Sequence, residues 1–485
     1  MDTRDKLLEI AGKTNFADSP KSLDVYAEDC SLVPRGTANY AVKLKKATQI
    51  QKVIELANEK LIPVVPVSSK IHFNGCTIPK QGGIVMDLSG MNQILEIDKL
   101  NRRVRIEPGV SWKQLYKELD KTNCRIMMPL FPHPERSVLT DHLEREVITN
   151  TVYDYGEPMQ SMEVVWPNGD LFRMGSASVT GYPDSPSKGA NPSGPGIDFY
   201  RLVQGAQGTM GVVTWTNLKI QQKTALDKIL FCPVTDLGRV IDFLYRILRI
   251  RIGQECLLLD NNNLAAIVAE DGDRDFEKLQ ATLPPWTLIL VLSSVNVRPE
   301  EKIKYEEDAL KSVLNNEFSD IVLTENLPGF VGLGGKMLSM LRQPWPDGET
   351  YWKNRVRGGC QSLFFIAKPN MAPSYISIVE MTAAEFGYPI AEIGKYIQPI
   401  EHNRACHLEF NFFYDPSNQA ERNNINELYN ETAKILLAEG AIFSRPYGSL
   451  ASLVYEKAAG YTMTLKRVKK IFDPNNIMNP GNLCF

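Results

Sequence analysis

Residues 61–76, LIPVVPVSSKIHFNGC, constrain the fold most strongly, because an apolar run passes there into a turn of small and polar residues. The β-branched first half predicts a buried strand. Ser68 and Ser69 then predict a turn whose backbone amides point outward. Such a turn can hold an anion such as a phosphate, and Lys70 adds positive charge beside it. Taken alone, the stretch is better explained as an ordinary loop between strands. Whether it binds a phosphate therefore has to be judged from the rest of the chain.

The flanking residues predict a β-α-β unit followed by further strands. Residues 40–44 are the first expected strand, and residues 48–60 carry apolar side chains at helical spacing before the strand of the 61–76 stretch. Another strand is expected at residues 83–88, and a turn at Pro108–Gly109 precedes an amphipathic helix.

The character of the chain changes near residue 222. Expected strands at 229–232 and 288–293 alternate with expected helices at 237–250 and 299–316, which predicts a separate α+β domain. Residues 329–336, GFVGLGGK, are glycine-rich but lack the strand and helix that flank a nucleotide-binding loop. We therefore expect a flexible loop at this position.

Composition narrows the function classes. A chain of 485 residues is too long for one core, and 43% hydrophobic and 23% charged residues are ordinary for a globular protein. The net charge of −3 gives no basic footprint for nucleic acid and no polybasic membrane patch. No apolar run is long enough to span a bilayer, and the N-terminus lacks the apolar core of a signal peptide. Eight cysteines without a CxxC pair indicate reduced thiols rather than a metal site. We expect a cytoplasmic enzyme with no nucleic-acid partner, membrane insertion or metal.

Eight pieces of the sequence, in order, resemble the FAD-binding flavoenzymes of the vanillyl-alcohol oxidase type, also called the p-cresol methylhydroxylase (PCMH) type. The most similar branch is that of vanillyl-alcohol oxidase and the 4-cresol dehydrogenase flavoprotein. The similarity covers residues 35–222 and 440–485 well and the middle weakly. The pieces are the β-α-β start, the loop VPVSSKIHFNG, VMDLSGMNQILEID, VRIEPGVSWKQLYKEL, VLTDHLER, MEVVWPNGDLFRMG, GPGIDFYRLVQGAQGTMGVVT and FDPNNIMNPG.

The resemblance implies an α+β fold with a two-part FAD-binding domain and an inserted α+β cap that forms the substrate site. The expected division is an N-terminal lead-in at 1–35, the FAD-binding domain at 36–222, the cap domain at 223–440 and a C-terminal segment at 441–485 that returns to the FAD domain. No GxGxxG follows a strand, so no NAD domain is expected.

The resemblance also implies which residues bind FAD. Four parts of the chain are expected to contribute. They are the loop around the pyrophosphate, a turn near the same cofactor, a segment beside the pyrophosphate and ring, and a glycine-rich stretch that cradles the flavin. These residues are Pro66, Val67, Ser68, Ser69, Lys70, Ile71, His72, Pro108, Gly109, Thr140, Asp141, His142, Glu144, Gly205, Gly208, Gly211, Val212 and Val213.

Three positions depart from the family pattern. The pyrophosphate loop is bulkier and poorer in glycine at residues 67–71. Residues 140–142, Thr-Asp-His, stand where the family has Gly-Asn-Thr, and the branch's catalytic aspartate falls at Pro132 or His133. These departures motivate a non-redox alternative for the chemistry.

Arg445, in FSRPYG, resembles the arginine of the branch's Tyr-Arg pair, with Ser444 in the place of the tyrosine. A guanidinium there suits a phenolate or carboxylate, because its planar fork pairs bidentately with oxyanions. The alternative is a surface arginine that caps a helix.

His133 lies near the position of the missing aspartate, where a neutral imidazole can take a substrate proton near pH 7. A solvated loop histidine explains it equally well. His142 either hydrogen-bonds the flavin or belongs to a salt-bridged turn.

His407 and Glu409 alternate on one expected strand, so their side chains face the same side. With His402 they could ligate a divalent metal, but a flavin-facing or substrate-binding histidine is the preferred interpretation. Covalent attachment of FAD in some family members makes several further residues candidates, namely His72, Tyr396, His402, His407 and Tyr414. Five aromatic residues either wall a pocket or belong to the core: Trp345, Tyr351, Trp352, Phe364 and Phe365.

The expected function is an FAD-dependent oxidoreductase that removes hydride from an alcohol or benzylic carbon of a small anionic, phenolic or 2-hydroxy acid substrate. The catalytic candidates are Arg445, His407 and His133. The alternative is a flavin-dependent rearrangement or cleavage of a C–O bond, as in relatives of alkylglycerone-phosphate synthase. A non-catalytic scaffold ranks last. An electron-acceptor protein and a second copy of the chain are the candidate protein partners.

Overall fold

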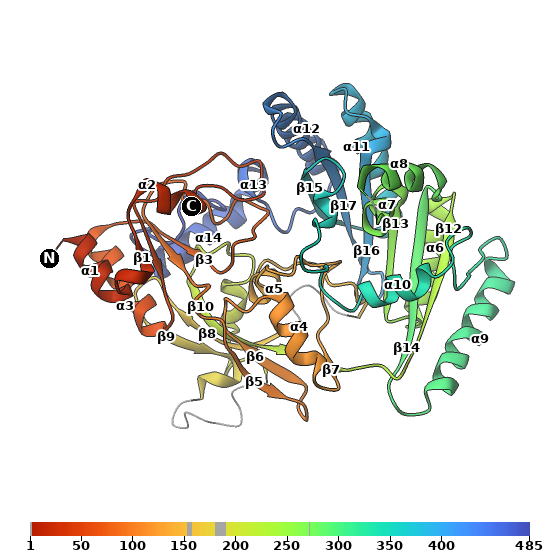
Figure 1. Cartoon of the computed structure of the whole chain (residues 1–485), viewed down its shortest axis with the longest axis horizontal. Helices are drawn as coiled ribbons and strands as arrows, with labels where there is room; N and C mark the ends of the chain where they lie inside the picture. Colours follow the sequence, from red (N-terminus) through yellow and green to blue (C-terminus); the bar gives the residue numbers. More distant parts are fainter. Residues whose placement is uncertain (1, 153–157, 180–190, 271) are drawn as a thin grey trace.

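The computed structural model describes residues 2–152, 158–179, 191–270 and 272–485. Its strands form sheets of four, five and six strands and one two-stranded sheet. The four- and five-stranded sheets lie in the left lobe of Figure 1, and the six-stranded sheet lies in the right lobe. The mixture of helices and sheets confirms the predicted α+β class, and we keep residues 222 and 440 as proposed domain boundaries.

The four-stranded sheet contains the predicted β-α-β unit. Its order is β1 (Phe16–Ala17), β2 (Tyr40–Lys43), β4 (Ile84–Asp87) and β3 (Val64–Val67). β2 and β3 both run parallel to β4, and α3 (Ala47–Lys60) connects them. The apolar face of α3 is buried against this sheet. This confirms the helix that was predicted from the spacing of apolar residues.

The five-stranded sheet is antiparallel and completes the left lobe. It runs in the order β5 (Ile94–Asp98), β6 (Arg103–Ile106), β10 (Val212–Lys219), β8 (Met159–Val165) and β9 (Leu171–Met174). β7 (Cys124–Arg125) pairs with β11 (Gln221–Gln222) beside it. The helices of this part are α1 (Thr3–Ala11), α2 (Pro20–Leu23), α4 (Trp112–Asp120) and α5 (Val138–Leu143).

The six-stranded antiparallel sheet forms the right lobe. Its order is β12 (Leu226–Val234), β14 (Trp286–Ser294), β13 (Glu255–Asp260), β16 (Ile393–Ile400), β17 (Ala405–Tyr414) and β15 (Gly359–Ala367). One face packs against α6 (Leu237–Arg249), α9 (Pro299–Glu317), α11 (Ala372–Glu385) and α12 (Gln419–Ala438). The opposite face packs against α7 (Asn261–Val268), α8 (Gly272–Thr282) and α10 (Leu333–Met340).

The expectation of a loop over residues 329–336 is wrong in its second half. Gly332, at φ 82°, ends the loop, and α10 begins at the next residue. Leu333 and Met337 are buried against the sheet, so burial of one helical face outweighs the low helix propensity of the glycines.

The C-terminal residues join the left lobe. α13 (Gly448–Lys457) and α14 (Ala459–Phe472) lead from the right lobe back to the four-stranded sheet, as the blue segment of Figure 1 shows. The Val64 amide donates to the Ile477 carbonyl at 2.8 Å, and the Asn479 amide donates to the Val64 carbonyl at 2.8 Å. The last segment therefore pairs in parallel with the first residue of β3, at the edge of the four-stranded sheet.

Among the described residues, no helix has both the length and the apolar character needed to cross a bilayer.

Candidate functional site

A first cavity, the turn cavity, lies where β3 ends and the chain turns. Besides the turn, it is bounded by α5 and by the glycine-rich residues that precede β10. Its lining residues are Pro66, Ser68, His72, Cys76, Thr77, Leu88, Pro108, Leu139, Thr140, Leu143, Glu144, Val203, Ala206, Gln207, Gly208, Gly211, Val212 and Val213.

The backbone of the turn is available to a ligand. Within the described residues, the amides of Ser69, Lys70 and Ile71 donate no hydrogen bond to another group of the chain. The Ser68 hydroxyl lies 2.5 Å from the hydroxyl of Thr140, at the first turn of α5. Free amides beside a helix N-terminus suit a phosphate, as the sequence predicted for this turn.

Glycine lets the walls of the turn cavity approach closely. Gly208 has φ 72°, and a Cβ there would lie 2.7 Å from Cγ of Pro66. A Cβ on Gly109 would lie 2.9 Å from the Leu88 carbonyl oxygen. Both distances are shorter than real Cβ contacts, so any larger residue would push the walls apart.

Two residues that line this cavity have buried polar atoms without a partner in the described chain. Nδ1 of His72 and Oε1 of Gln207 make no hydrogen bond, whereas Nε2 of His72 lies 2.8 Å from the Ser69 carbonyl oxygen. Burial and the nearby charge of Arg136 lower the pKa of His72 to about 3, so its imidazole is neutral at physiological pH. Neutral, unpartnered polar atoms suit a polar cofactor that donates and accepts hydrogen bonds.

Ten of the residues predicted to bind FAD line the turn cavity: Pro66, Ser68, His72, Pro108, Thr140, Glu144, Gly208, Gly211, Val212 and Val213. The others lie beside it and do not line it: Val67, Ser69, Lys70, Ile71, Gly109, Asp141, His142 and Gly205. The exposed Lys70 does not plug the cavity. Their roles remain predictions. The lining residues that sequence analysis missed are mostly apolar, and no local pattern distinguishes them from core residues.

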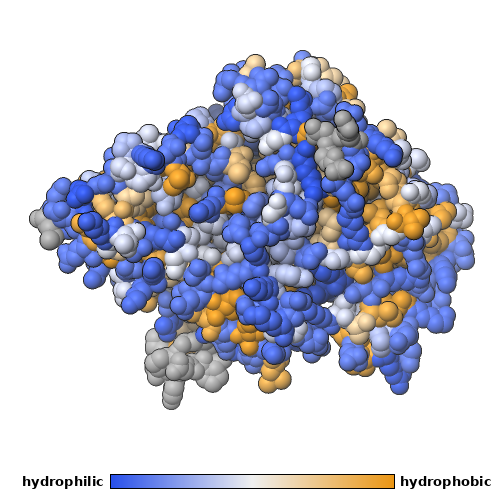
Figure 2. All heavy atoms as spheres, in the orientation of Figure 1, coloured by the Kyte–Doolittle hydropathy of each residue, from blue (hydrophilic) through white to orange (hydrophobic). Residues whose placement is uncertain are grey.

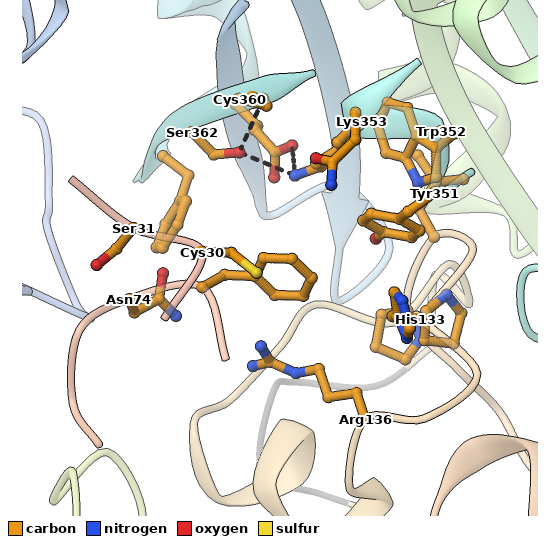
Figure 3. Close-up of a pocket in the computed structure, with 18 of the residues that line it drawn as sticks. Cys30, Ser31, Asn74, His133, Arg136, Tyr351, Trp352, Lys353, Cys360 and Ser362 are labelled. Atoms are coloured by element: carbon orange, nitrogen blue, oxygen red, sulfur yellow. Dashed lines mark hydrogen bonds and ion pairs between the residues drawn. The ribbon is translucent and has the colours of Figure 1, made fainter. Parts of the chain in front are cut away.

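A second cavity, the aromatic cavity, lies between the lobes (Figure 3). The loop at residues 29–31, residues 73–74 and the segment 129–147 form its left-lobe walls. The right lobe contributes residues 351–354 and strands β15, β16 and β17. Its aromatic walls are Phe73, Tyr351, Trp352, Phe364, Tyr396 and Tyr414.

The aromatic side chains pack on each other at this cavity. The rings of Phe73 and Tyr351 stack with centroids 5.6 Å apart, and the ring of His133 lies 5.2 Å from Tyr351. Tyr351 and Trp352 also belong to a core cluster of the right lobe, whereas Trp345 and Phe365 belong to its cores without lining the cavity. The two interpretations of the five aromatic residues are therefore each right for part of the set.

A polar cluster stands on the right-lobe wall. The Lys353 ammonium donates to Oε1 of Glu409 at 2.6 Å and to the Ser362 hydroxyl at 2.9 Å, as the dashed lines of Figure 3 show. Nε2 of His407 lies 3.2 Å from Oε2 of Glu409, which confirms that these two side chains share a face of β17. The neighbouring Lys353 and His407 hold the pKa of the buried Glu409 carboxyl well below its usual range.

A second charged cluster separates the two cavities. The buried Arg136 guanidinium pairs with Asp141, and it lies 3.0 Å from Glu144 and 3.7 Å from Glu146. Glu144 lines the turn cavity, whereas Arg136 and Glu146 line the aromatic cavity. Sequence analysis gave no role to Arg136 or Lys353. The partner of Lys353 is 56 residues away in the sequence, whereas those of Arg136 lie within ten residues in a segment whose sequence shows no helical or strand periodicity.

The three catalytic candidates differ in their access to the aromatic cavity. His133 lines it, and burial lowers the pKa of its imidazole. His407 lies behind Glu409 and is almost fully buried. Arg445 lies behind Phe364, 4.1 Å from the ring centroid, and pairs with Glu146 at 2.8 Å. It is buried, so it is not the surface arginine of the alternative interpretation.

The remaining histidines lie apart from this wall. His142 is buried against Trp112, with ring centroids 5.9 Å apart. His402 lies in the turn between β16 and β17 at φ 56° and donates its amide to the Thr151 carbonyl. In the described part of the chain, no group of three or more His, Cys, Asp or Glu side chains is placed to hold a metal ion.

Two family models match the chain. One, described as an FAD binding domain, covers residues 38–175, and the other, described as the C-terminal domain of FAD linked oxidases, covers residues 396–483. The chain thus carries both domains of the FAD linked oxidases, and its fold is that of the PCMH-type FAD flavoenzymes. The predicted resemblance, the FAD cofactor and the class of FAD-dependent oxidoreductase are thereby confirmed.

Relatives and a solved structure extend over nearly the whole chain. The glycolate oxidase subunit GlcD of Bacillus subtilis (strain 168) is 22% identical over 99% of this chain and 96% of its own length. The 4-cresol dehydrogenase [hydroxylating] flavoprotein subunit of Pseudomonas putida is 23% identical over 91% and 87%. A crystal structure of p-cresol methylhydroxylase with substrate bound has a TM-score of 0.82 at 20% identity, covering 99% of this chain and 96% of that one. The chain therefore has the fold of that structure.

Proposed function

We propose that this flavoenzyme oxidises a small aromatic substrate at a carbon that bears a hydroxyl group or adjoins the ring. The observation that carries the proposal is the aromatic cavity between the lobes, with its buried Lys353–Glu409–His407 cluster. Aromatic walls suit an aromatic ring, because stacked and edge-to-face contacts add to the burial of its apolar surface.

We assign the turn cavity to FAD. The free amides after β3 and the first turn of α5 would hold the pyrophosphate, and the glycines before β10 would let the cofactor pass close to the backbone. When bound, FAD supplies the acceptor for the two electrons of the oxidised carbon. The isoalloxazine ring would then lie toward the aromatic cavity, on the side where Arg136 and Glu144 separate the two cavities.

The residues of the aromatic cavity would bind and orient the substrate. Tyr351, Phe364 and Tyr396 enclose a ring and exclude water from it. Glu409, kept ionised by Lys353, accepts a hydrogen bond from a substrate hydroxyl. His133 lies on the left-lobe wall of the cavity, and its neutral imidazole would accept the substrate proton.

The names of the relatives point to two substrate classes, a 2-hydroxy acid for the glycolate oxidase subunit and a phenol for the 4-cresol dehydrogenase. The aromatic lining favours the second class. Both names include the word subunit, and we propose that a partner protein is one candidate acceptor of the electrons.

Anaerobic reduction of the bound flavin tests the proposal. The FAD-loaded protein is mixed in turn with 4-hydroxybenzyl alcohol, 4-cresol, D-lactate and glycolate, and the visible flavin band is followed. We expect bleaching with a phenolic compound and little with the 2-hydroxy acids. Bleaching only by the 2-hydroxy acids would reverse the substrate assignment. Product formed with the band unchanged and with no external acceptor would favour the non-redox chemistry.

A further inference from the structure

We propose that Glu409 selects a neutral, hydroxyl-bearing aromatic substrate and excludes a carboxylate, and that Lys353 and His407 are the positioning residues that hold it. The inference rests on the proposed function, since it concerns the ligand of the same aromatic cavity. It differs from the expectation that Arg445 anchors an anionic substrate.

Toward a ligand, the ionised carboxylate of Glu409 can only accept hydrogen bonds. Each carboxylate oxygen already accepts one hydrogen bond from the protein, Oε1 from Lys353 at 2.6 Å and Oε2 from His407 at 3.2 Å. An ionised carboxylate offers about two acceptor sites on each oxygen, so capacity remains for a donor from the cavity. It offers nothing to a second carboxylate.

Lys353 is held in place from behind the wall. The Ser362 hydroxyl, which accepts from Lys353, donates to Oδ1 of Asn411 at 2.6 Å. Nδ2 of Asn411 donates in turn to Oδ1 of Asn263 at 3.2 Å, at the start of α7. Because these groups are buried or half-buried and bonded to each other, moving the ammonium away from Glu409 would break two hydrogen bonds.

Two other cations near the cavity, Arg136 and Arg445, are already paired with carboxylates. Arg136 is shared by three carboxylates, and Arg445 pairs with Glu146 behind the Phe364 ring. The charged lining residues are three cations and four carboxylates: Arg136, Lys353, Arg422, Asp29, Asp141, Glu146 and Glu409. The formal charge is therefore −1, which repels an anionic ligand.

Arg422, on α12, also lines the cavity, and no salt bridge to it is found among the described residues. Asp29 lines the same cavity, so the charges of Arg422 and Asp29 cancel in the formal sum.

Three ligands of similar size isolate the role of the hydroxyl proton. Phenol is neutral at pH 7 and donates a hydrogen bond, anisole is neutral and does not, and benzoate is an anion. Their dissociation constants for the FAD-loaded protein are measured by calorimetry at pH 7, with no turnover. We expect phenol to bind at least about tenfold more tightly than anisole or benzoate, since a hydrogen bond to a charged, desolvated partner is involved.

Glu409→Gln tests the residue itself. We expect it to remove most of the preference for phenol over anisole and to improve the binding of benzoate relative to phenol. Glu349→Gln is the matched control, because Glu349 is an exposed carboxylate paired with Arg355 outside the cavity, and it should leave the ranking unchanged. Lys353→Met should weaken phenol binding as well, because Glu409 would lose the ammonium that holds it.

The ranking in the unmodified protein decides the inference even if a variant does not fold. Tighter binding of benzoate than of phenol would overturn it, as would an unchanged preference in Glu409→Gln. The proposed function fails separately, through the absence of flavin bleaching by any aromatic alcohol or cresol. A protein that bleaches with a phenolic alcohol yet prefers benzoate would keep the function and refute this inference.

Discussion

At the scale of single residues, buried ionisable side chains make the free energy of unfolding depend on pH. His142 is fully enclosed beside Trp112, and burial lowers its pKa to about 4. The pKa of an unfolded histidine is about 6.5, so between these values the unfolded chain binds a proton that the folded chain does not. The free energy of unfolding therefore falls as the pH falls through this window.

We expect His142→Asn to flatten this pH dependence. The histidine contributes about 3 kcal/mol to the loss of stability between pH 7 and pH 4, from 1.36 kcal/mol for each pKa unit. Thermal unfolding midpoints of both proteins at pH 7.5, 6 and 5 check the prediction. The two proteins are compared at pH 7.5 as the reference, and an equal decline in both would show that His142 is not responsible.

Arg445 is expected to matter for stability through Glu146. Arg445→Met removes the cation 2.8 Å from that carboxylate and from the face of Phe364. We expect a loss of about 3 kcal/mol, because a buried charge is left with one partner fewer. Unfolding midpoints measure the loss, and Arg445→Met with Glu146→Gln should recover part of it. Arg404→Met, at a side chain that is 82% exposed, serves as the control and should change little.

Period-two alternation was sufficient to predict that His407 and Glu409 share a face, and their 3.2 Å contact confirms it. Lys353 could not be predicted in the same way. It lies in the short helix Trp352–Asn354, 56 residues before Glu409, and only the pairing of β15 with β17 and the packing of this helix bring them together. Local sequence patterns give direction along one element, and not the partner on another.

At the scale of the element, the turn after β3 lies against the first turn of α5, and together they form one end of the turn cavity. The strand–turn order in the 61–76 stretch was readable from small residues after a β-branched run. The role of Gly208 could not be predicted in this way. Glycine is required there because Pro66, which is distant in the sequence, packs against it. The same limit explains α10, where tertiary burial makes a helix from glycine-rich residues.

Gly208→Ala should weaken FAD retention. The added Cβ would lie 2.7 Å from Pro66 Cγ and would force the turn cavity to change shape. Gly329→Ala is the matched control, because Gly329 also has positive φ, 85°, but a Cβ there meets nothing within 4 Å. The FAD content after dialysis is measured for both variants. We expect at least a tenfold weaker FAD affinity for Gly208→Ala, corresponding to ~1.4 kcal/mol, and equal retention in the two variants would contradict the assignment of this cavity.

At the scale of the whole molecule, the two ends of the chain are joined at the turn cavity. Nδ2 of Asn479 donates to the Cys76 carbonyl at 2.8 Å and to the Gln207 carbonyl at 2.7 Å. Cys76 and Gln207 both line the turn cavity. The C-terminal segment thus connects two lining segments that are far apart in the sequence.

Asn479→Ala is expected to lower both stability and FAD affinity. Two buried carbonyls would lose their donor, at a cost of about 1–3 kcal/mol each, and alanine tolerates the positive φ of 42° poorly. Asn479→Gly separates the two effects, because glycine removes the side chain without the backbone strain. Unfolding midpoints with and without added FAD measure both. A Gly variant as stable as the natural protein would show that the two hydrogen bonds contribute nothing.

A crystal structure of the FAD-loaded protein soaked with phenol tests the central claim most directly. We predict FAD along the turn after β3 and phenol in the aromatic cavity, with its hydroxyl oxygen within hydrogen-bond distance of the Glu409 carboxylate. Phenol bound with its hydroxyl on Arg445, or FAD bound outside the turn cavity, would contradict the account.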